Sequence, residues 1–353
     1  LTACCSENYW HFGGNRILQY QPAKQRFIVE KCTQTELMSV EQNYCRAIKL
    51  DRSLTPQERV DLIEMRRVYW KEKANLSQKP IWITYDKLYK GGDNGEYLFH
   101  YVRQNCPEVD IYYLLTETSA DYQRLKEDDH VLIHGTKEAK LKVLQAQLIL
   151  ATHTNTMSGC GFTTEGEKRY LKNLYNAEIV CIQHGLTVQD IAIWQNIVCD
   201  NTKLYCCASK NEIKNILQPS YGYTRKEVRL TGLARYDGLV SKDKRQILIT
   251  PTWRRNLVNA GSSGNVRAKN NFFKDTEYFK IYNNLINDER LIVCAKKHNY
   301  RIMYLIHPTL SAQIDDFDKN EYVDIVAAAG DMSYEKVLTE SSLMITDYSG
   351  VQF

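Results

Sequence analysis

The stretch AEIVCIQHGLTVQD, residues 177–190, carries the pattern on which the fold prediction rests. Residues 178–182 are a short β-rich run that predicts a buried strand, and Gln183-His184-Gly185 follows it directly. Open α/β folds bind ligands at the carboxyl ends of their strands, so this pattern places an imidazole where a substrate would lie. Glycine permits a sharp turn and a close approach. Histidine can take a proton from a hydroxyl near neutral pH, so His184 is a candidate general base.

The composition is that of a soluble globular chain with room for two domains. The chain has 353 residues, of which 43% are hydrophobic and 25% charged. No run of 18 apolar residues predicts a membrane-spanning helix. The first residues, LTACCSENYW, do not resemble a signal peptide, and Leu1 suggests that the true start is missing.

The cysteines favour a reducing compartment. There are eleven, an odd number, and no Cys-x-x-Cys pair occurs. Several lie in apolar runs that we interpret as strands: Cys181, Cys206, Cys207 and Cys294. This usage is typical of reduced, buried thiols in the cytoplasm rather than of disulfides or zinc sites. With no cluster of metal-ligand spacing in the sequence, we predict no bound metal.

Positive charge is concentrated in one part of the chain. Residues 203–269 hold 14 Lys and Arg against 4 Asp and Glu, a net charge of +10, whereas the whole chain carries +4. Such a block suggests an anionic partner: phosphate groups, nucleic acid or an acidic membrane surface. A solvated basic face would give the same pattern.

The first 79 residues give weaker signals. Residues 17–20 and 26–30 suggest a hairpin. Thr55-Pro-Gln-Glu58 predicts the start of a helix that runs to about residue 75, with Val60, Ile63, Arg67 and Trp70 along one stripe. This basic helix could lie on a membrane surface, although packing on its own domain is the more common role and is the one we favour.

From Pro80 onward strands and helices alternate, the signature of parallel sheets flanked by helices. The first series of predicted strands covers residues 81–85, 109–115, 130–134, 147–152, 178–183 and 204–208. The second covers residues 228–230, 247–250, 301–306, 322–325 and 343–346, with a flexible loop at 260–265. We predict an α/β fold with two Rossmann-like lobes facing a cleft, and the domains 1–79, 80–232 and 233–353. Because the chain stops just after a strand, we expect the last lobe to be incomplete.

Two kinds of loop follow these strands. Residues 89–95, YKGGDNG, join a strand to a helix, and their glycines Gly91, Gly92 and Gly95 could present free amides to a phosphate or sugar. In the second lobe, PTWR (251–254), HP (307–308) and TDYSG (346–350) each follow a strand. Carboxyl ends of parallel strands share one edge, so Arg254, His307, Thr346 and Ser349 should converge, a set suited to a diphosphate.

Two other motifs point to no site. His134-Gly135 also follows a predicted strand, but charged residues flank it, and we interpret it as an exposed turn. The segment DFDKN, residues 316–320, begins like a calcium loop, yet Glu321 and Ala327 occupy positions where such a loop needs glycine and glutamate.

Several ordered motifs together resemble one family. IQHG (182–185), LTGLARYD (230–237), ITPTWR (249–254), LIHP (305–308) and MITDYSGVQF (344–353), with YDKLYKGGDNGEYLF (85–99), are similar to the CDP-glycerol glycerophosphotransferases of teichoic acid and capsule synthesis. The resemblance covers residues 80–353. The family often has Trp-His-Gly-Thr and Gly-x-Pro-Arg where this chain has Gln-His-Gly-Leu and Gly-Leu-Ala-Arg.

The resemblance implies a GT-B-type fold and transfer of a polyol phosphate from CDP-polyol to a hydroxyl, with release of CMP. It implies that His184 is the general base. The implied donor-binding residues are Arg235, Arg254, His307, Thr346, Asp347, Ser349 and Gly350, and the glycine loop with Gly91, Gly92, Asn94 and Gly95 lies on the acceptor side. No cofactor is implied, since CDP-glycerol or CDP-ribitol is a substrate.

The resemblance also implies partners and a location. The acceptor would be a lipid-linked polyol phosphate. The protein would then be cytoplasmic and peripheral, bound to the anionic surface on the inner face of the cell membrane. Nucleic acid is not expected as a partner. Two alternatives stay open: a GT-B glycosyltransferase that uses a nucleotide sugar, and a non-catalytic polymer-binding relative.

Overall fold

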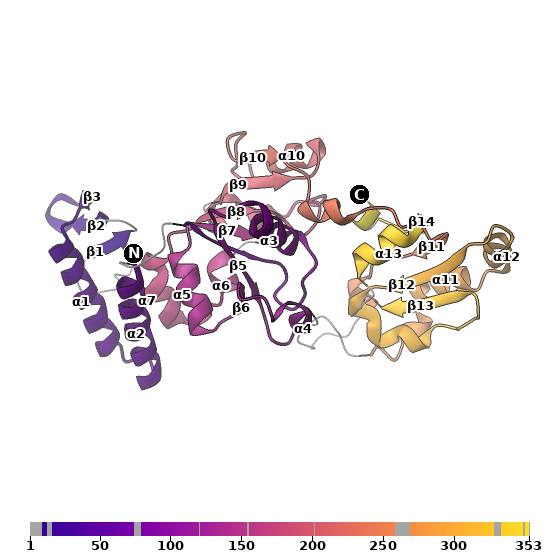
Figure 1. The fold of residues 1–353 in the computed structure, drawn as a ribbon, viewed down its shortest axis with the longest axis horizontal. Coiled ribbons are helices and arrows are strands. Elements are labelled where there is room, and N and C mark those ends of the chain that lie inside the picture. The colour runs from indigo at the N-terminus through magenta and orange to yellow at the C-terminus, as the bar shows by residue number, and fades with distance from the viewer. Residues whose placement is uncertain are drawn as a thin grey trace. The chain divides into compact units, whose positions relative to one another are not determined.

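Two units, Leu1–Ala234 and Arg235–Phe353, make up the chain, and Figure 1 shows the elements of each. The structure is a computed structural model. It describes residues 9–12, 16–73, 79–119, 121–153, 155–200, 202–257, 269–327, 333–348 and 350–352. The flexible loop expected at 260–265 therefore lies outside the described residues.

The centre of unit 1 is a seven-stranded parallel sheet in the order β10-β9-β8-β7-β4-β5-β6. The strands are β4 (Ile81–Tyr85), β5 (Asp110–Leu115), β6 (Val131–Ile133), β7 (Leu148–Ala151), β8 (Glu178–Cys181), β9 (Thr202–Cys207) and β10 (Val228–Leu230). Parallel strands are covered by helices on both faces, which explains their near-continuous apolar runs.

Alternation along the strands builds two cores, one on each face of this sheet. Ile83 and Ile149 point into a core that also includes residues of α1, α2, α5 and α7. Their neighbours Trp82 and Leu150 belong to a second core with Phe99 of α3. The helices of unit 1 are α1 (Gln34–Leu50), α2 (Pro56–Lys73), α3 (Asn94–Asn105), α4 (Tyr122–Leu125), α5 (Lys137–Gln145), α6 (Thr156–Gly159), α7 (Glu165–Leu171), α8 (Ala192–Gln195), α9 (Ile197–Asp200) and α10 (Lys210–Ile216).

The strand order of the seven-stranded sheet reverses beside β4, the first of its strands along the chain. After β4 the chain adds β5 and β6 on one side, and then returns to place β7 on the other side of β4. The following strands β8, β9 and β10 continue outward from β7. The carboxyl ends of β4 and β7 therefore mark a topological switch point, the usual ligand position in open α/β sheets.

The N-terminal segment packs on unit 1. Strands β1 (Tyr9–Phe12), β2 (Arg16–Gln21) and β3 (Arg26–Lys31) form a small antiparallel sheet, which includes the expected hairpin. Thr33 and Glu36 form a capping box that starts α1, a helix that our prediction missed. Helix α2 starts as expected, because Thr55 and Glu58 exchange the same pair of hydrogen bonds.

The buried face of α2 differs from the predicted stripe. Val60 is exposed, whereas the fully buried Arg66 forms ion-pair hydrogen bonds with Glu41 and donates to the side chain of Asn173 at 2.9 Å. The other buried side chains of the helix are Leu62, Ile63, Met65 and Tyr69. The helix thus packs on its own unit, the alternative that we favoured.

Unit 2 has a four-stranded parallel sheet in the order β13-β12-β11-β14. Its strands are β11 (Gln246–Ile249), β12 (Arg301–Ile306), β13 (Val323–Ala327) and β14 (Ser341–Ile345), and its helices are α11 (Glu277–Ile286), α12 (Glu289–Lys297) and α13 (Tyr334–Glu340). The chain leaves β11 toward β12 and β13, then returns to place β14 on the other side of β11. This sheet therefore also has a switch point, between β11 and β14.

The predicted α/β class is confirmed, with two local corrections. Residues 228–230 were placed in the second series of strands, but as β10 they pair with β9 in unit 1. Cys294 lies exposed in helix α12 and not in a strand. The described cysteines are free thiols.

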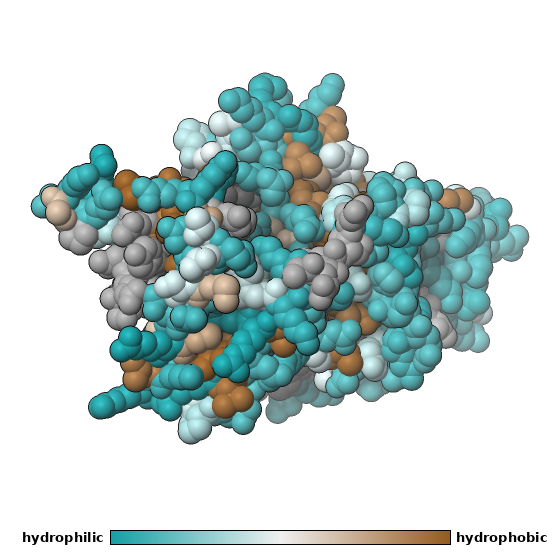
Figure 2. Space-filling model, turned by 60° about the vertical axis from the view of Figure 1, so that its left-hand side comes forward, coloured by the Kyte–Doolittle hydropathy of each residue, from teal (hydrophilic) through white to brown (hydrophobic). Residues whose placement is uncertain are grey.

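Among the described helices, none is long and apolar enough to cross a membrane. The face of the molecule in Figure 2 is mostly hydrophilic, with apolar residues in small groups.

Candidate functional site

Three adjacent strands of unit 1 end in register. Tyr85 of β4 pairs with Ala151 of β7, and Ala151 pairs with Cys181 of β8. The residues that follow these strands therefore share one edge of the sheet, beside the switch point. His184 stands at this edge, three residues beyond the end of β8, and its side chain is exposed.

The turn before His184 is built by Gln183. Its φ is 55°, in the left-handed region that is uncommon for residues other than glycine. The buried Gln183 side chain donates to the carbonyl of Cys206 at 2.7 Å and accepts from the Thr187 hydroxyl at 2.6 Å. We expected Gly185 to make the sharp turn, but the positive φ belongs to Gln183. These two side-chain hydrogen bonds hold the strained conformation in place.

Asn94 ties the glycine loop to the same turn. Its amide nitrogen donates to the carbonyls of Ile182 and Gln183 at 3.2 and 2.7 Å, and its side chain is buried. Asn94 is the first residue of α3, whose N-cap is Asp93. The glycine loop therefore fixes the backbone on which His184 stands.

The tautomer of His184 follows from its partner. Nδ1 lies 3.0 Å from the carbonyl oxygen of Thr152, directly after β7. A carbonyl only accepts hydrogen bonds, so Nδ1 carries the proton and Nε2 keeps the basic lone pair. An imidazole held in this way is ready to accept a proton through Nε2.

The amides of the glycine loop are not available to a ligand, and our expectation of free amides was wrong. The amide of Gly91 donates to Asp121, that of Gly92 to Glu96, each at 2.8 Å, and that of Gly95 to Asp86 at 2.7 Å. A Cβ on Gly95 would lie 2.7 Å from the Asp86 carboxylate, so glycine is required there. The loop is an internally satisfied scaffold.

Asp86 is the buried centre of this scaffold. It also accepts from the amide of Glu96 at 3.0 Å and from the Tyr113 hydroxyl at 2.9 Å. Burial, and then the charge of Asp93, raise the pKa of Asp86 to about 7 against the lowering effect of these hydrogen bonds. Glu96 behaves oppositely, because hydrogen bonds from Arg124 overcome its burial and lower its pKa to about 2.

We did not predict Asp86 or His153 as site residues. Asp86 directly follows β4, and His153 lies two residues beyond β7. His153 lies one residue after Thr152 and packs edge-on against Tyr85, with ring centroids 5.2 Å apart. Burial, and then the neighbouring His184, lower the pKa of His153. Its position two residues beyond β7 is the signal that could have revealed it.

Unit 2 gathers a second polar cluster at its own switch point. Arg254 follows β11, Asp347 follows β14, and their side chains form an ion pair with N–O 2.7 Å. Asp347 also accepts from the amide of Thr252 at 3.1 Å. The Arg254 guanidinium lies 4.3 Å from the ring centre of Tyr348. Burial opposes ionisation of Asp347, but hydrogen bonds, first from Arg254, lower its pKa overall.

His307 follows β12 beside this cluster, and its ring centre is 5.9 Å from that of Trp253. Nδ1 of His307 accepts from the amide of Thr309 at 3.2 Å. Since Nδ1 is an acceptor, the neutral ring carries its proton on Nε2 and can donate there. His184 and His307 are therefore held in opposite tautomers.

The other predicted donor residues are placed as follows. The Thr346 hydroxyl donates to the carbonyl of Thr250 at 2.7 Å, so it links β14 to β11. Gly350 is exposed at the start of a 3₁₀ turn, and Arg235 lies in the turn Ala234–Gly238 with its guanidinium near the Tyr236 ring. Ser349 lies outside the described residues.

The remaining candidate features point to no site. His134, which we interpreted as exposed, is half-buried, and burial lowers its pKa. In the described part of the chain, Asp128, Asp129 and His130 have metal-ligand spacing, but Arg103 forms ion pairs with both carboxylates.

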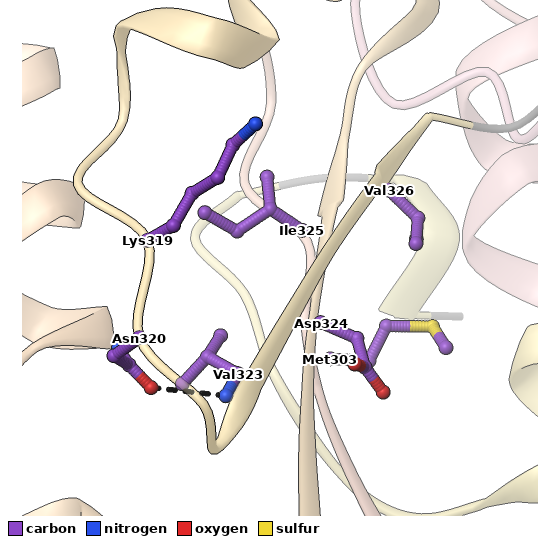
Figure 3. Close-up of a pocket in the computed structure, with 7 residues that line it drawn as sticks. All are labelled: Met303, Lys319, Asn320, Val323, Asp324, Ile325 and Val326. Atoms are coloured by element: carbon purple, nitrogen blue, oxygen red, sulfur yellow. Dashed lines mark hydrogen bonds between the residues drawn. The ribbon is translucent and has the colours of Figure 1, made fainter.

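The surface hollow in Figure 3, about 440 Å³, lies on edge strand β13. Asn320 in it accepts from the amide of Val323 at 3.1 Å. Lys319 forms an ion pair with Asp315, and Asp324 forms one with Arg301. Because these polar groups are engaged within the protein, the hollow offers no convergent set to a ligand.

Two parallel sheets with polar clusters at their carboxyl edges define an α/β protein of the GT-B type. The chain matches the family CDP-Glycerol:Poly(glycerophosphate) glycerophosphotransferase over residues 65–353, and it belongs to this family. This confirms the resemblance drawn from the motifs.

Named relatives agree with this assignment. The chain is 37% identical over 280 residues to the minor teichoic acid biosynthesis protein GgaB of Bacillus subtilis (strain 168), covering 79% of this chain and 31% of GgaB. The chain thus spans about a third of that relative. Its fold is similar to the wall teichoic acid polymerase TagF, with a TM-score of 0.50 at 12% identity, covering 91% of this chain and 76% of that one. A TagF H548A structure gives a TM-score of 0.51 at 11% identity, with the same coverage.

Proposed function

We propose that this chain transfers a polyol phosphate, glycerol phosphate first among the candidates, from CDP-polyol to an acceptor hydroxyl in teichoic acid or capsule synthesis, releasing CMP. The observation that carries the proposal is the hydrogen bond from His184 Nδ1 to the Thr152 carbonyl, which leaves Nε2 basic at the edge of the switch point. Family membership supplies the reaction class.

Unit 1 supplies the base in the proposed reaction. The acceptor oxygen attacks the β-phosphorus of the donor and forms a new phosphate ester bond. Nε2 of His184 takes the hydroxyl proton, and the bond from the β-phosphorus to the bridging oxygen breaks, so that CMP leaves with that electron pair. General-base assistance of this kind contributes about 10²–10⁴ in rate. Asn94 and the glycine loop with Gly91, Gly92 and Gly95 act as the scaffold of the acceptor side.

Unit 2 binds the donor in this proposal. Nε2–H of His307 and the guanidinium of Arg254 donate to the diphosphate, where charge develops as CMP leaves. Asp347 holds Arg254 through their ion pair, and Thr346 fixes β14 against β11. We assign Arg235, Ser349 and Gly350 to the same donor site.

A lipid-linked acceptor and an anionic membrane surface are part of the proposal, which places the protein on the inner face of the cell membrane. The segment after His184 supports this, because Val188, Ile193, Trp194 and Val198 are between 68% and 85% exposed. Helix α10, which contacts the segment through hydrogen bonds from Asn215, carries exposed lysines. Exposed apolar side chains beside basic ones suit an anionic bilayer.

The membrane proposal is tested by co-sedimentation with vesicles that contain anionic lipid. We expect Trp194→Ala to lower the bound fraction several-fold. The matched control Phe272→Ala removes an equally exposed aromatic ring from unit 2 and should bind like the wild type. Unchanged binding of Trp194→Ala would contradict the assignment of this segment.

The reaction is tested by CMP release from CDP-glycerol and CDP-ribitol, each with a lipid-linked polyol-phosphate acceptor, followed by analysis of the product. A phosphodiester product with either donor supports the proposal, and the preferred donor identifies the polyol. A glycoside made from a nucleotide sugar would support a GT-B glycosyltransferase instead. If neither reaction occurs and CDP does not raise the melting temperature, the chain is a non-catalytic relative.

A further inference from the structure

Three basic residues follow neighbouring strands at the switch point of unit 1. Lys87 lies two residues beyond β4, His153 two residues beyond β7, and His184 three residues beyond β8. Because Tyr85, Ala151 and Cys181 pair in register, these three residues lie at the same edge of the sheet, in the order of their strands. Of these three residues, the proposed reaction uses only His184, and it gives no role to Lys87 or His153.

Electrostatics support an anion at this place. Burial lowers the pKa of His153, and the neighbouring His184 and Lys87 act in the same direction, as basic groups near one another do. Lys87 is exposed and His153 half-buried. A neutral His153 supplies a ring N–H, and Lys87 supplies a permanent charge.

Two neighbouring carboxylates, Asp86 and Asp200, accept hydrogen bonds from within the protein. Asp86 accepts from the amides of Gly95 and Glu96. Asp200, the acidic group that acts on His153, accepts from the amide and the hydroxyl of Thr156, each at 3.0 Å. Burial, and then the charge of Asp93, raise the pKa of Asp86 to about 7, so Asp86 is partly protonated near neutral pH.

We propose that Lys87 and His153 bind a phosphodiester phosphate of the acceptor, next to the hydroxyl that reacts. This inference rests on the proposed function and names the acceptor's recognised group. Neighbouring strands lie about 4.8 Å apart, so a phosphate between the ends of β4 and β7 lies about one and a half strand spacings, roughly 7 Å, from the end of β8 that leads to His184. One polyol unit can bridge that length. The subsite therefore selects an acceptor whose terminal hydroxyl is one unit away from a phosphate.

Direct binding tests the subsite without any turnover. The probe is a short glycerol phosphodiester oligomer, titrated calorimetrically into the full chain, beside a methylphosphonate analogue of the same length that has no charge. We expect the wild type to bind the anionic oligomer more tightly than the neutral one. Lys87→Met should weaken binding of the anionic oligomer about tenfold, since a hydrogen bond between charged groups is lost. His153→Gln should weaken it less.

Two controls make the result specific. Lys126→Met removes an exposed lysine that precedes β6, which lies two strands away from β4 in the sheet, and should leave binding unchanged. The neutral analogue should bind Lys87→Met and the wild type equally. Melting temperatures of all variants verify folding, and Lys87→Glu provides a second test, with a larger loss than Lys87→Met.

Three outcomes would overturn the subsite. They are no binding by the wild type at millimolar oligomer, equal binding by Lys87→Met and the wild type, and equal losses for the charged and neutral oligomers. Absence of CMP release would reject the proposed function but leave these binding results intact. If transfer is observed, Lys87→Met should raise the KM for the anionic acceptor and leave the KM for CDP-polyol unchanged.

Discussion

The two sheets of this chain reverse their strand order in the same way, yet the edges at the two reversals carry different chemistry. Beside the reversal at β4 and β7, buried carboxylates take the loop amides, and His184 donates through Nδ1. Beside the reversal at β11 and β14, Arg254 pairs with Asp347, and His307 accepts through Nδ1. One edge therefore presents a basic nitrogen, and the other presents hydrogen-bond donors.

This difference shows how one topology can divide the parts of a phosphoryl transfer. Strand order determines where polar side chains meet, but it does not determine what they do there. The local partner of each histidine decides that, since a carbonyl fixes one tautomer and an amide N–H fixes the other. The carbonyl oxygen of Thr152 thus makes His184 suited to act as the proposed base. The amide N–H of Thr309 makes His307 suited to donate a hydrogen bond to CDP-polyol.

Replacing the two histidines separately should have the largest effect and tests the comparison directly. We expect His184→Ala to lower the rate of CMP release by about 10²–10⁴ and to leave the dissociation constant for CDP-polyol within a few-fold of the wild type. His307→Ala should instead weaken CDP-polyol binding. Steady-state kinetics and calorimetry separate these effects.

Matched variants keep this test specific. His184→Asn can still donate to the Thr152 carbonyl but has no basic nitrogen, so it should be as inactive as His184→Ala. His298→Ala removes an exposed histidine at the end of α12 and should behave like the wild type. Turnover of His184→Ala within a few-fold of the wild type would reject the role of the base.

Loss of the Arg254 guanidinium should have the next largest effect, confined to the donor. Arg254→Met removes the charge that Asp347 holds in place, and we expect CDP-polyol affinity to fall about 10- to 100-fold. Arg255→Met changes the exposed neighbour in the same loop and should bind like the wild type. An equal loss in both variants would mean that the basic charge of the loop, and not the paired guanidinium, holds the donor.

Sequence alone predicted most of the strands and both polar edges. Apolar runs such as 81–85 and 301–306 are long enough to mark buried strands, and polar residues after them indicate the edge. The capping box of Thr33 and Glu36 was visible, and with it α1 could have been predicted. The predicted stripe on α2 was wrong because the buried face of the helix includes Arg66, whose partners, such as Asn173, are distant in the sequence.

The rest depends on contacts that no local pattern encodes. The order of the strands, which creates both switch points, follows from how the helices pack and not from the strand sequences themselves. Asn94 contacts the carbonyl of Gln183 across 89 positions of the chain, and Thr152 contacts His184 across 32. The glycine loop looked like an anion site because its local sequence does not show that Asp86, Glu96 and Asp121 fill it.

Asn94 offers a sharper test of the unit 1 edge, with a smaller effect. Asn94→Ala leaves the carbonyls of Ile182 and Gln183 without their buried donor, which we expect to destabilise the turn by about 1–3 kcal/mol. CMP release should fall about tenfold while CDP-polyol affinity stays unchanged. Asn94→Asp should be worse than Asn94→Ala, because a carboxylate cannot donate to a carbonyl. Similar turnover in Asn94→Ala and the wild type would show that this link does not position His184.

The smallest predicted effect contrasts the carboxyl groups of the two edges, whose pKa values shift in opposite directions. The pKa of Asp86 is raised to about 7, so between its unfolded value of 3.8 and 7 the folded state holds a proton that the unfolded state has lost. The stability from Asp86 is fully present below pH 3.8 and declines by at most about 1.4 kcal/mol per pH unit as the pH rises to 7. The pKa of Asp347 is lowered, so its contribution is present above its unfolded value and is lost as the pH falls through the folded one.

Carboxyl ¹³C titration and melting curves can distinguish these two behaviours. We expect the Asp86 signal to titrate near pH 7 and that of Asp347 below its ordinary range. Asp86→Asn cannot ionise but keeps one acceptor oxygen, so the melting temperature of the wild type should fall relative to this variant between pH 5 and 7. Asp347→Asn should match the pH trend of the wild type in that window, since Asp347 is already ionised there. An Asp86 signal that titrates near pH 4 would show that burial is outweighed by its hydrogen bonds from the Tyr113 hydroxyl and from the amides of Asp93, Gly95 and Glu96. The two edges would then hold equivalent carboxylates.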